Sequence, residues 1–113
     1  MAFVFMFIPT LGRYRKEKQY GDALEEIFKK NNLSYEREKR LPPSFEGEKY
    51  SRNIPDFIIE NKIILDLKAK LMINKDDYFQ MRRYLISLKK KLGLIINFRQ
   101  VYLRPKRVLN SLV

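Results

Sequence analysis

The chain of 113 residues contains no histidine, cysteine or tryptophan. Without histidine and cysteine it lacks the ligands of the usual zinc sites, the base of a Ser-His-Asp triad, a thiol nucleophile and any disulfide. Catalysis by this chain would therefore rest on carboxylates, lysine or tyrosine, and carboxylates favour a hard metal ion.

Glycine and proline are scarce, with 4 and 5 residues respectively, whereas 45% of the residues are hydrophobic. This composition supports one hydrophobic core and argues against disorder. No repeat, low-complexity tract or long linker divides the sequence. We therefore expect residues 1–113 to form a single domain.

Acidic residues are outnumbered, since 24 Lys and Arg against 13 Asp and Glu give a formal charge of +11. Such an excess predicts a polyanionic partner. Nucleic acid is favoured over an anionic membrane surface, because the basic residues are spread along the chain and do not form one amphipathic stripe. A solvated basic surface is the simpler alternative.

Long hydrophobic runs are also absent. The apolar start, residues 1–9, is far shorter than the ~20 residues that span a bilayer. It has neither the basic region nor the cleavage site of a signal peptide. We therefore expect a cytoplasmic protein without a membrane partner.

Two segments have the periodicity of an amphipathic helix. Over residues 13–31 apolar and aromatic side chains recur every three or four positions, and the Asn31-Asn32 pair supplies a stop. Residues 75–91 repeat the pattern without glycine or proline, and Asn74 is a suitable N-cap. The sequence thus predicts two helices.

Alternating patterns between the helices predict strands. Residues 33–41 alternate with charges on one face, and residues 44–50 contain a Glu46-Gly47 turn signal. We interpret this region as strands joined by loops.

The clearest hairpin signal is a pair of apolar runs, residues 54–60 and 62–69, separated by a tight turn at Asn61. Residues 92–98 form a short apolar run typical of a strand buried on both faces, and residues 106–109 suit a last, exposed strand. The order of elements predicts a small α/β fold, a mixed β-sheet flanked by two helices.

Three charged residues interrupt the hairpin: Asp56 in its first strand, and Asp66 and Lys68 in its second. Side chains alternate faces along a strand, so Asp66 and Lys68 share one face. If the turn spans residues 60–62, Asp56 and Asp66 lie opposite each other, with Cβ atoms about 5 Å apart.

Two opposed carboxylates destabilise a hairpin unless a cation lies between them or one takes a proton. Mg²⁺ suits such a pair, because it is held by one or two carboxylates together with waters and phosphate oxygens. Lys68 could then orient or deprotonate the attacking water, or stabilise negative charge on the phosphate. The alternative is a structural salt bridge between Asp66 and Lys68, with Asp56 as a turn residue.

The pattern Pro-Asp, nine residues, Asp-x-Lys resembles the signature of the PD-(D/E)XK nuclease superfamily. Further segments between residues 12 and 110 are similar, in order, to its small GxxExxY family. These segments are Gly12, Glu17, Tyr20, Ala23 and Leu24, then Asp56-Phe57, Asp66 to Ala69, Gln80 and Tyr84, residues 93–98, and Lys106 to Val108. The chain departs from the family at Tyr14, where a glycine is usual, and at Asp66, where a glutamate is usual.

The resemblance implies a restriction-endonuclease-like core with Asp56 and Asp66 as catalytic metal ligands and Lys68 as the catalytic lysine. Glu17 would be a further catalytic carboxylate and metal ligand, although its basic neighbours also allow a surface charge pair. The implied cofactor is Mg²⁺ or Mn²⁺.

Four residues of the second helix are candidate substrate-binding residues. Gln80 and Tyr84, one helical turn apart, would face the same cleft and hold nucleic acid or the catalytic lysine. Tyr84 as a core residue and Gln80 as a solvated neighbour are the simpler alternative. Arg82 and Arg83 would contact phosphates, or else be solvated.

The leading prediction is a Mg²⁺-dependent deoxyribonuclease that hydrolyses phosphodiester bonds with water as nucleophile. Its basic surface would grip the DNA backbone largely without sequence preference. The alternative is a non-catalytic basic nucleic-acid-binding protein, an inactive relative of nucleases. A structural subunit that uses residues 1–7 as an interface is a third interpretation. A homodimer is a further alternative, although the sequence contains no pattern that indicates a dimer interface.

Overall fold

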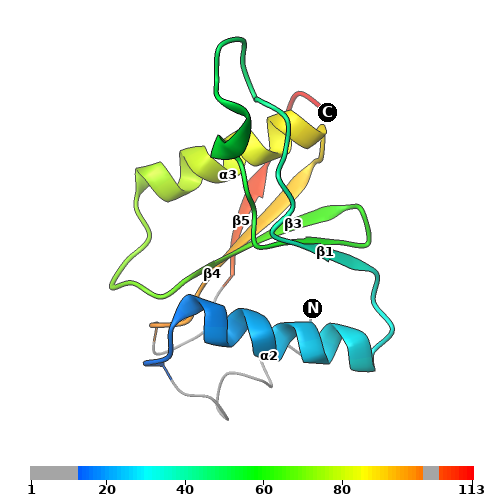
Figure 1. Ribbon diagram of the computed structural model, residues 1–113. Coiled ribbons are helices and arrows are strands. Elements are labelled where there is room, and N and C mark those ends of the chain that lie inside the picture. Colours follow the sequence, from blue (N-terminus) through cyan, green and yellow to red (C-terminus); the bar gives the residue numbers. More distant parts are fainter. Residues whose placement is uncertain (1–12, 101–104) are drawn as a thin grey trace.

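A five-stranded mixed sheet lies between two helices in the computed structural model, which describes residues 13–100 and 105–113 (Figure 1). The strand order is β1-β2-β3-β4-β5; β3 and β4 run parallel, and the other neighbours are antiparallel. This is the predicted α/β fold, consistent with a restriction-endonuclease-like core. The elements are α2 (Glu17–Lys30), β1 (Tyr35–Arg37), the 3₁₀ helix η1 (Tyr50–Arg52), β2 (Phe57–Ile59), β3 (Ile63–Lys68), α3 (Lys75–Leu88), β4 (Leu92–Asn97) and β5 (Lys106–Leu109).

The β2–β3 hairpin has the predicted turn and register, but its strands are shorter than the predicted residues 54–60 and 62–69, and Asp56 lies just before the first strand instead of within it. Glu60 and Asn61 have positive φ angles of 54° and 52°, and the Lys62 N–H donates to Ile59 O over 3.0 Å. Ile59 pairs with Ile63, and the register continues without a bulge to the last pair of the ladder. The chain before β2 is thereby placed alongside the second half of β3.

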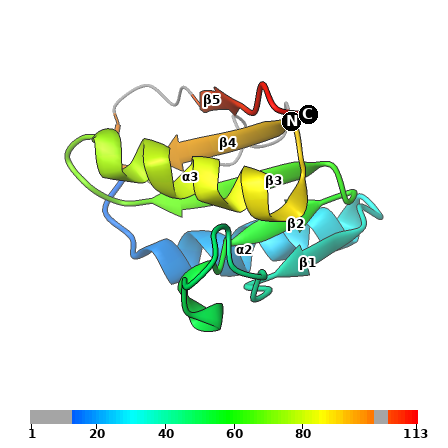
Figure 2. The ribbon, with the colours of Figure 1, turned by 90° about the horizontal axis from the view of Figure 1, so that it is seen from above.

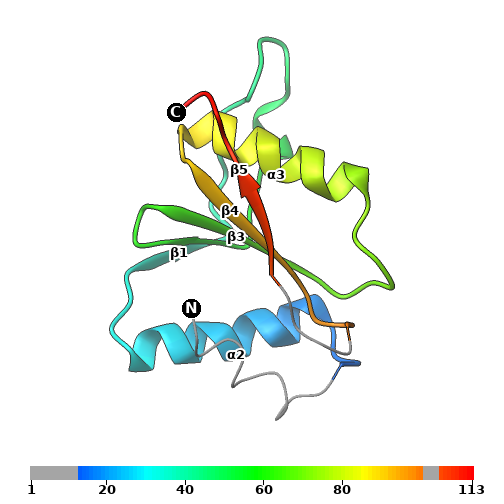
Figure 3. The ribbon, with the colours of Figure 1, turned by 180° about the vertical axis from the view of Figure 1, so that it is seen from behind.

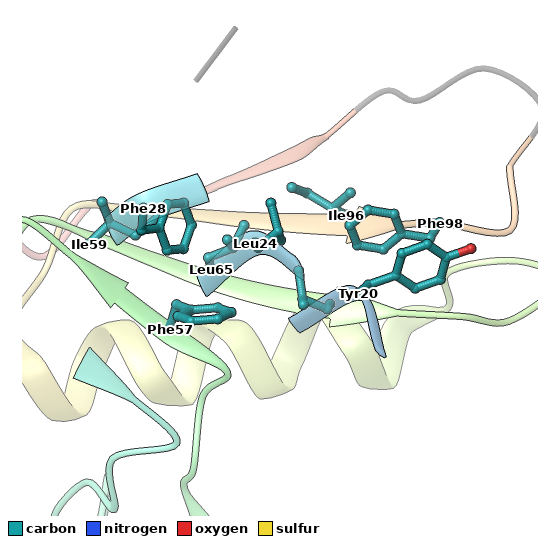
Figure 4. Packing of buried hydrophobic residues seen from close by; sticks show 9 residues of the cluster. Tyr20, Leu24, Phe28, Phe57, Ile59, Leu65, Ile96 and Phe98 are labelled. Carbon is teal, nitrogen blue, oxygen red and sulfur yellow. The ribbon is translucent and has the colours of Figure 1, made fainter. Parts of the chain in front are cut away.

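Helix α2 covers one face of the sheet (Figures 1 and 3). Its buried residues Tyr20, Leu24 and Phe28 follow at four-residue steps and pack against side chains of β2, β3 and β4 (Figure 4). Tyr20 stacks on Phe98 with ring centroids 4.1 Å apart, and Phe28 meets Phe57 edge-on at 5.1 Å. These aromatic contacts hold α2 in one orientation on the sheet.

Helix α3 covers the opposite face (Figure 2), with Met81, Tyr84 and Leu85 buried against β2, β3 and β4. Gly93 of β4 lies directly beneath Met81. A Cβ at Gly93 would be 2.7 Å from Met81 Cγ, so the absence of a side chain there lets the helix approach the sheet.

Both predicted helices form, with shifted ends. Helix α2 begins at Glu17 rather than at residue 13, because its N-cap, Lys16, is extended. Asn74 caps α3 as predicted, by accepting a hydrogen bond from the Asp77 N–H. The helix ends at Leu88 rather than at residue 91, because Lys89 is left-handed.

The prediction of strands over residues 33–41 and 44–50 is wrong, because the first strand is much shorter and the second does not form. Only Tyr35–Arg37 pairs in the sheet, and the described residues 44–50 contain no strand. Gly47, at φ 94°, makes the predicted turn, and the Glu48 carboxylate accepts the Ser44 N–H over 2.8 Å. Such local side-chain bonds satisfy backbone groups that a sheet would otherwise pair.

The strands predicted over residues 92–98 and 106–109 are confirmed, apart from one residue, as β4 and β5. Gly12 and the apolar residues 1–9 lie outside the described residues. Within the described part of the chain, no helix has the length and apolar character needed to cross a membrane.

Candidate active site

An acidic pair lies where β3 extends beyond β2. Asp66 is only 4% exposed, and Asp56 directly precedes β2. The last ladder pair of the hairpin is Phe57 with Leu65. Beyond that pair, Asp56 Oδ2 accepts the Leu67 N–H over 2.6 Å. The side chain of Asp56 therefore continues the ladder and is held against β3.

The electrostatics of the pair are those of two carboxylates that share one buried site. Burial first, then the charge of Asp66 and a hydrogen bond with its carboxyl group, raise the pKa of Asp56 to about 8, against the lowering effect of the Leu67 N–H. Asp66 Oδ2 is buried and accepts no hydrogen bond from the described residues. It lies 3.0 Å from Lys68 Nζ, with which it forms an ion pair.

Lys68 is held as a cation between the sheet and α3. Its Nζ donates to Gln80 Oε1 over 2.9 Å and lies 3.7 Å from Asp77 Oδ1. Burial lowers the pKa of Lys68, but the neighbouring carboxylates, Asp66 first, outweigh burial and raise it. A protonated Lys68 stabilises negative charge and cannot take a proton from water.

Asp77 is a functional candidate that the sequence interpretation missed. It closes a capping box with Asn74, and Lys70 Nζ donates to both its oxygens at 3.1 and 2.9 Å. Burial raises the pKa of Asp77, but the Asn74 N–H and the two lysines outweigh burial and lower it. The Asn-x-x-Asp spacing at the helix start is the signal that could have identified this residue.

Asn97 was also missed, although it lies within one of the family-like segments. Its Oδ1 accepts the Lys70 N–H over 3.2 Å, and its Nδ2 donates to Lys70 O over 2.8 Å. Asn97 is buried at the end of β4. It therefore fixes the path of the chain just after Lys68.

Glu17 lies at the rim of the site. It begins α2, and its Oε1 accepts the Ala69 N–H over 3.2 Å. A cavity of about 80 Å³ is lined by both Glu17 and Asp56. Among residues 13–100 and 105–113, however, no three acidic side chains form a cluster that could hold a metal ion. The structure thus brings together Asp56, Asp66 and Lys68, with Glu17 nearby and bound to the backbone.

The four helix residues divide into different environments. Gln80 contacts Lys68, as above. Tyr84 is 2% exposed and donates from its hydroxyl to Ile54 O over 3.3 Å; burial raises its pKa. Arg82 and Arg83 are partly exposed, and Arg83 Nε lies 4.0 Å from a Glu48 oxygen.

Comparisons with known proteins identify the family and the fold of the chain. A sequence model of the PD-(D/E)XK nuclease superfamily matches residues 1–108. No curated protein matches the chain. Among solved structures, the crystal structure of SSO0001 is similar with a TM-score of 0.63 and 19% sequence identity. The match covers 82% of this chain and 49% of that chain, so this chain spans about half of SSO0001, and at this identity the likeness shows the fold alone.

Proposed function

Because the chain belongs to the PD-(D/E)XK nuclease superfamily, we propose that it is a metal-dependent nuclease that hydrolyses phosphodiester bonds in DNA. We assign it, from the motifs of its sequence, to the GxxExxY family, with residues 1–113 as one nuclease domain. Membership implies a nucleic-acid substrate, and nucleases of this superfamily generally use divalent metals. The choice of DNA and of Mg²⁺ or Mn²⁺ is part of the proposal.

The observation that carries the proposal is the buried pair of Asp56 and Asp66. Two carboxylates held together in a buried site repel each other. Asp66 Oδ2 is buried without a hydrogen bond from the described residues, and its ion-pair partner is Lys68 Nζ at 3.0 Å. Two adjacent carboxylates beside one lysine leave acceptor oxygens that fit a hard divalent cation. Asp56 and Asp66 would hold the ion, and Glu17 is the third candidate ligand.

The chain's own residues supply the remaining chemistry. A bound divalent ion supplies Lewis-acid activation of the phosphate and of water. Lys68 presents a fixed positive charge to the phosphate, where negative charge develops during hydrolysis. Gln80 and Asp77 orient Lys68 from α3. A cation that is already in place needs no reorganisation during the reaction, which is the general advantage of preorganised charge.

The surrounding surface favours a nucleic-acid substrate. The formal charge of +11 provides attraction for a phosphate backbone, and such attraction does not depend on base sequence. Lys68 and Lys70 lie within the site itself, at the end of β3. The positive charge therefore reaches the carboxylates that would hold the ion.

The proposal is tested by Asp66→Asn in a cleavage and binding assay with Mg²⁺. We expect cleavage of plasmid and oligonucleotide DNA to be lost, while DNA binding is kept or strengthened, because a negative charge is removed. Asp76→Asn makes the same change at an exposed position of α3 and should cleave normally. Full cleavage by Asp66→Asn would overturn the assignment.

One observation favours a second function. The described residues hold no cluster of three acidic side chains, and Glu17 is bound to Ala69. A non-catalytic nucleic-acid-binding protein would suit such a site. It predicts DNA binding that ignores Mg²⁺ and tolerates Asp56→Asn and Lys68→Ala, with no cleavage by the wild-type protein.

A further inference from the structure

A second surface lies where the loop of residues 42–53 extends past α3 (Figure 1). Together with α3 it forms a groove of about 480 Å³, lined by Phe45, Glu48, Lys49, Arg52 and Arg83. We name it the Phe45 groove. Nothing in the nuclease mechanism above uses it.

The loop is fastened to the body of the protein. At its base, the Leu41 N–H donates to Asn53 O over 2.8 Å, and Leu41 is fully buried. Ser87 of α3 donates from its hydroxyl to Pro42 O over 2.5 Å. The groove is therefore bounded by a loop whose two ends are fixed.

Glu48 organises the interior of the loop. One of its oxygens accepts hydrogen bonds from the Ser44 N–H, the Ser44 hydroxyl and Asn53 Nδ2. These bonds, that of the Ser44 N–H first, lower the pKa of Glu48 against the effect of burial. The single carboxylate of the groove is thus bound within the loop, with Arg83 4.0 Å from its other oxygen.

The groove presents an exposed aromatic ring next to cationic side chains. Phe45 is 59% exposed, a large fraction for a phenyl ring, and Tyr50, in the same loop, is 58% exposed. Lys49 and Arg52 are also exposed. An exposed aromatic ring with cations beside it fits an unpaired nucleotide, whose base stacks while its phosphate is neutralised.

The groove is linked to the candidate active site through α3 and through the segment that follows the loop. Arg83 lies one turn of α3 beyond Gln80, which contacts Lys68. At the end of the loop, Asn53 precedes Asp56 by three residues, and Tyr84 binds the intervening Ile54 carbonyl. The Phe45 groove and the acidic pair therefore flank the same turn of α3.

From this juxtaposition we propose that the Phe45 groove binds an unpaired nucleotide next to the scissile phosphate, so that single-stranded DNA is the preferred substrate. The inference rests on the proposed nuclease function. In a duplex the faces of the bases are stacked on one another and cannot reach Phe45, whereas the cations would attract both forms of DNA. Phe45 is therefore the residue that distinguishes single-stranded DNA from duplex DNA.

The test measures binding alone, in EDTA, so that cleavage plays no part. Fluorescence anisotropy with a labelled oligothymidine and with a hairpin duplex of the same length gives both affinities. Phe45→Ala should weaken binding to the single strand roughly fivefold or more, the contribution of one stacked base. Duplex binding should change less than twofold. Phe45→Tyr, which keeps a ring, should restore single-strand binding, and Phe45→Leu should not.

Tyr14→Ala is the matched control, because Tyr14 is an exposed aromatic residue outside the groove, and it should bind both DNAs like the wild type. An equal loss on single strand and duplex, or no loss on either, overturns the inference. Either result leaves the proposed nuclease intact, since that proposal depends on cleavage by the Asp66→Asn and wild-type proteins.

Discussion

The acidic pair predicts an unusual response of stability to pH in the metal-free protein. Replacing Asp56 by Asn removes one of the two charges while keeping an oxygen that can accept the Leu67 N–H. The new amide can also donate to Asp66. Asp56→Asn should therefore stabilise the protein relative to the wild type by an amount that grows as pH rises above about 4, where Asp56 of the unfolded chain ionises, and that levels off above about pH 8.

The sign and size of this change in the free energy of unfolding follow from the pKa of Asp56, which rises from an ordinary 3.8 to about 8 on folding. Between these values the folded state binds more protons than the unfolded state, so wild-type stability falls as pH rises. At about 1.36 kcal/mol per pKa unit the difference is at most roughly 6 kcal/mol. Because Asp56 is not wholly buried, solvent screening reduces this difference in stability. We expect Asp56→Asn to be more stable than the wild type by about 2–4 kcal/mol at pH 9.

The assay is urea unfolding followed by circular dichroism in EDTA at pH 5, 7 and 9. The free energy of unfolding of Asp56→Asn minus that of the wild type should be smallest at pH 5, larger at pH 7 and largest at pH 9. Glu26→Gln, which neutralises an exposed carboxylate of α2, should show no such trend. A difference between Asp56→Asn and wild type that is constant from pH 5 to 9 would refute the reasoning.

Other positions give independent tests. Gly93→Ala should lower the free energy of unfolding by about 1–3 kcal/mol, because the new methyl group meets the buried Met81; unchanged stability in urea would mean that α3 is free to move. Asp77→Asn should lower it by about 1–2 kcal/mol at pH 7, through loss of the ion pairs with Lys70 and Lys68. Because the pKa of Asp77 is lowered in the folded protein, that loss should shrink as pH falls below about 4, and a loss that persists in acid would show that charge is not its cause. The logarithm of the DNA association constant should fall linearly with that of salt concentration; binding that is insensitive to salt would argue against backbone contacts.

The hairpin was predictable because the two-residue alternation of side chains along a strand and the length of the turn together determine its register. A three-residue turn centred on Asn61 leaves one register, and strand parity then sets Asp66 and Lys68 on one face. The approximate helices followed from apolar spacing in the same way. These features depend on repeating patterns, which a sequence displays directly.

What could not be predicted depends on single side chains that bind backbone groups. Glu48 ties a loop where strands were expected, and Asp77 joins a helix cap to two lysines. Glu17 reaches Ala69, 52 positions away in the chain. Such bonds have no period, and whether a carboxylate binds a backbone N–H or a neighbouring charge is decided by the packing of the folded chain.

The proposed function depends above all on the binding of a divalent ion by Asp56 and Asp66. Calorimetric titration of Mg²⁺ and of Mn²⁺ into the wild type, Asp66→Asn and Asp76→Asn measures this binding without cleavage. Both ions should bind the wild type and Asp76→Asn, and their binding should be lost or greatly weakened in Asp66→Asn. Equal binding to all three proteins, or none to the wild type, would contradict the proposed function.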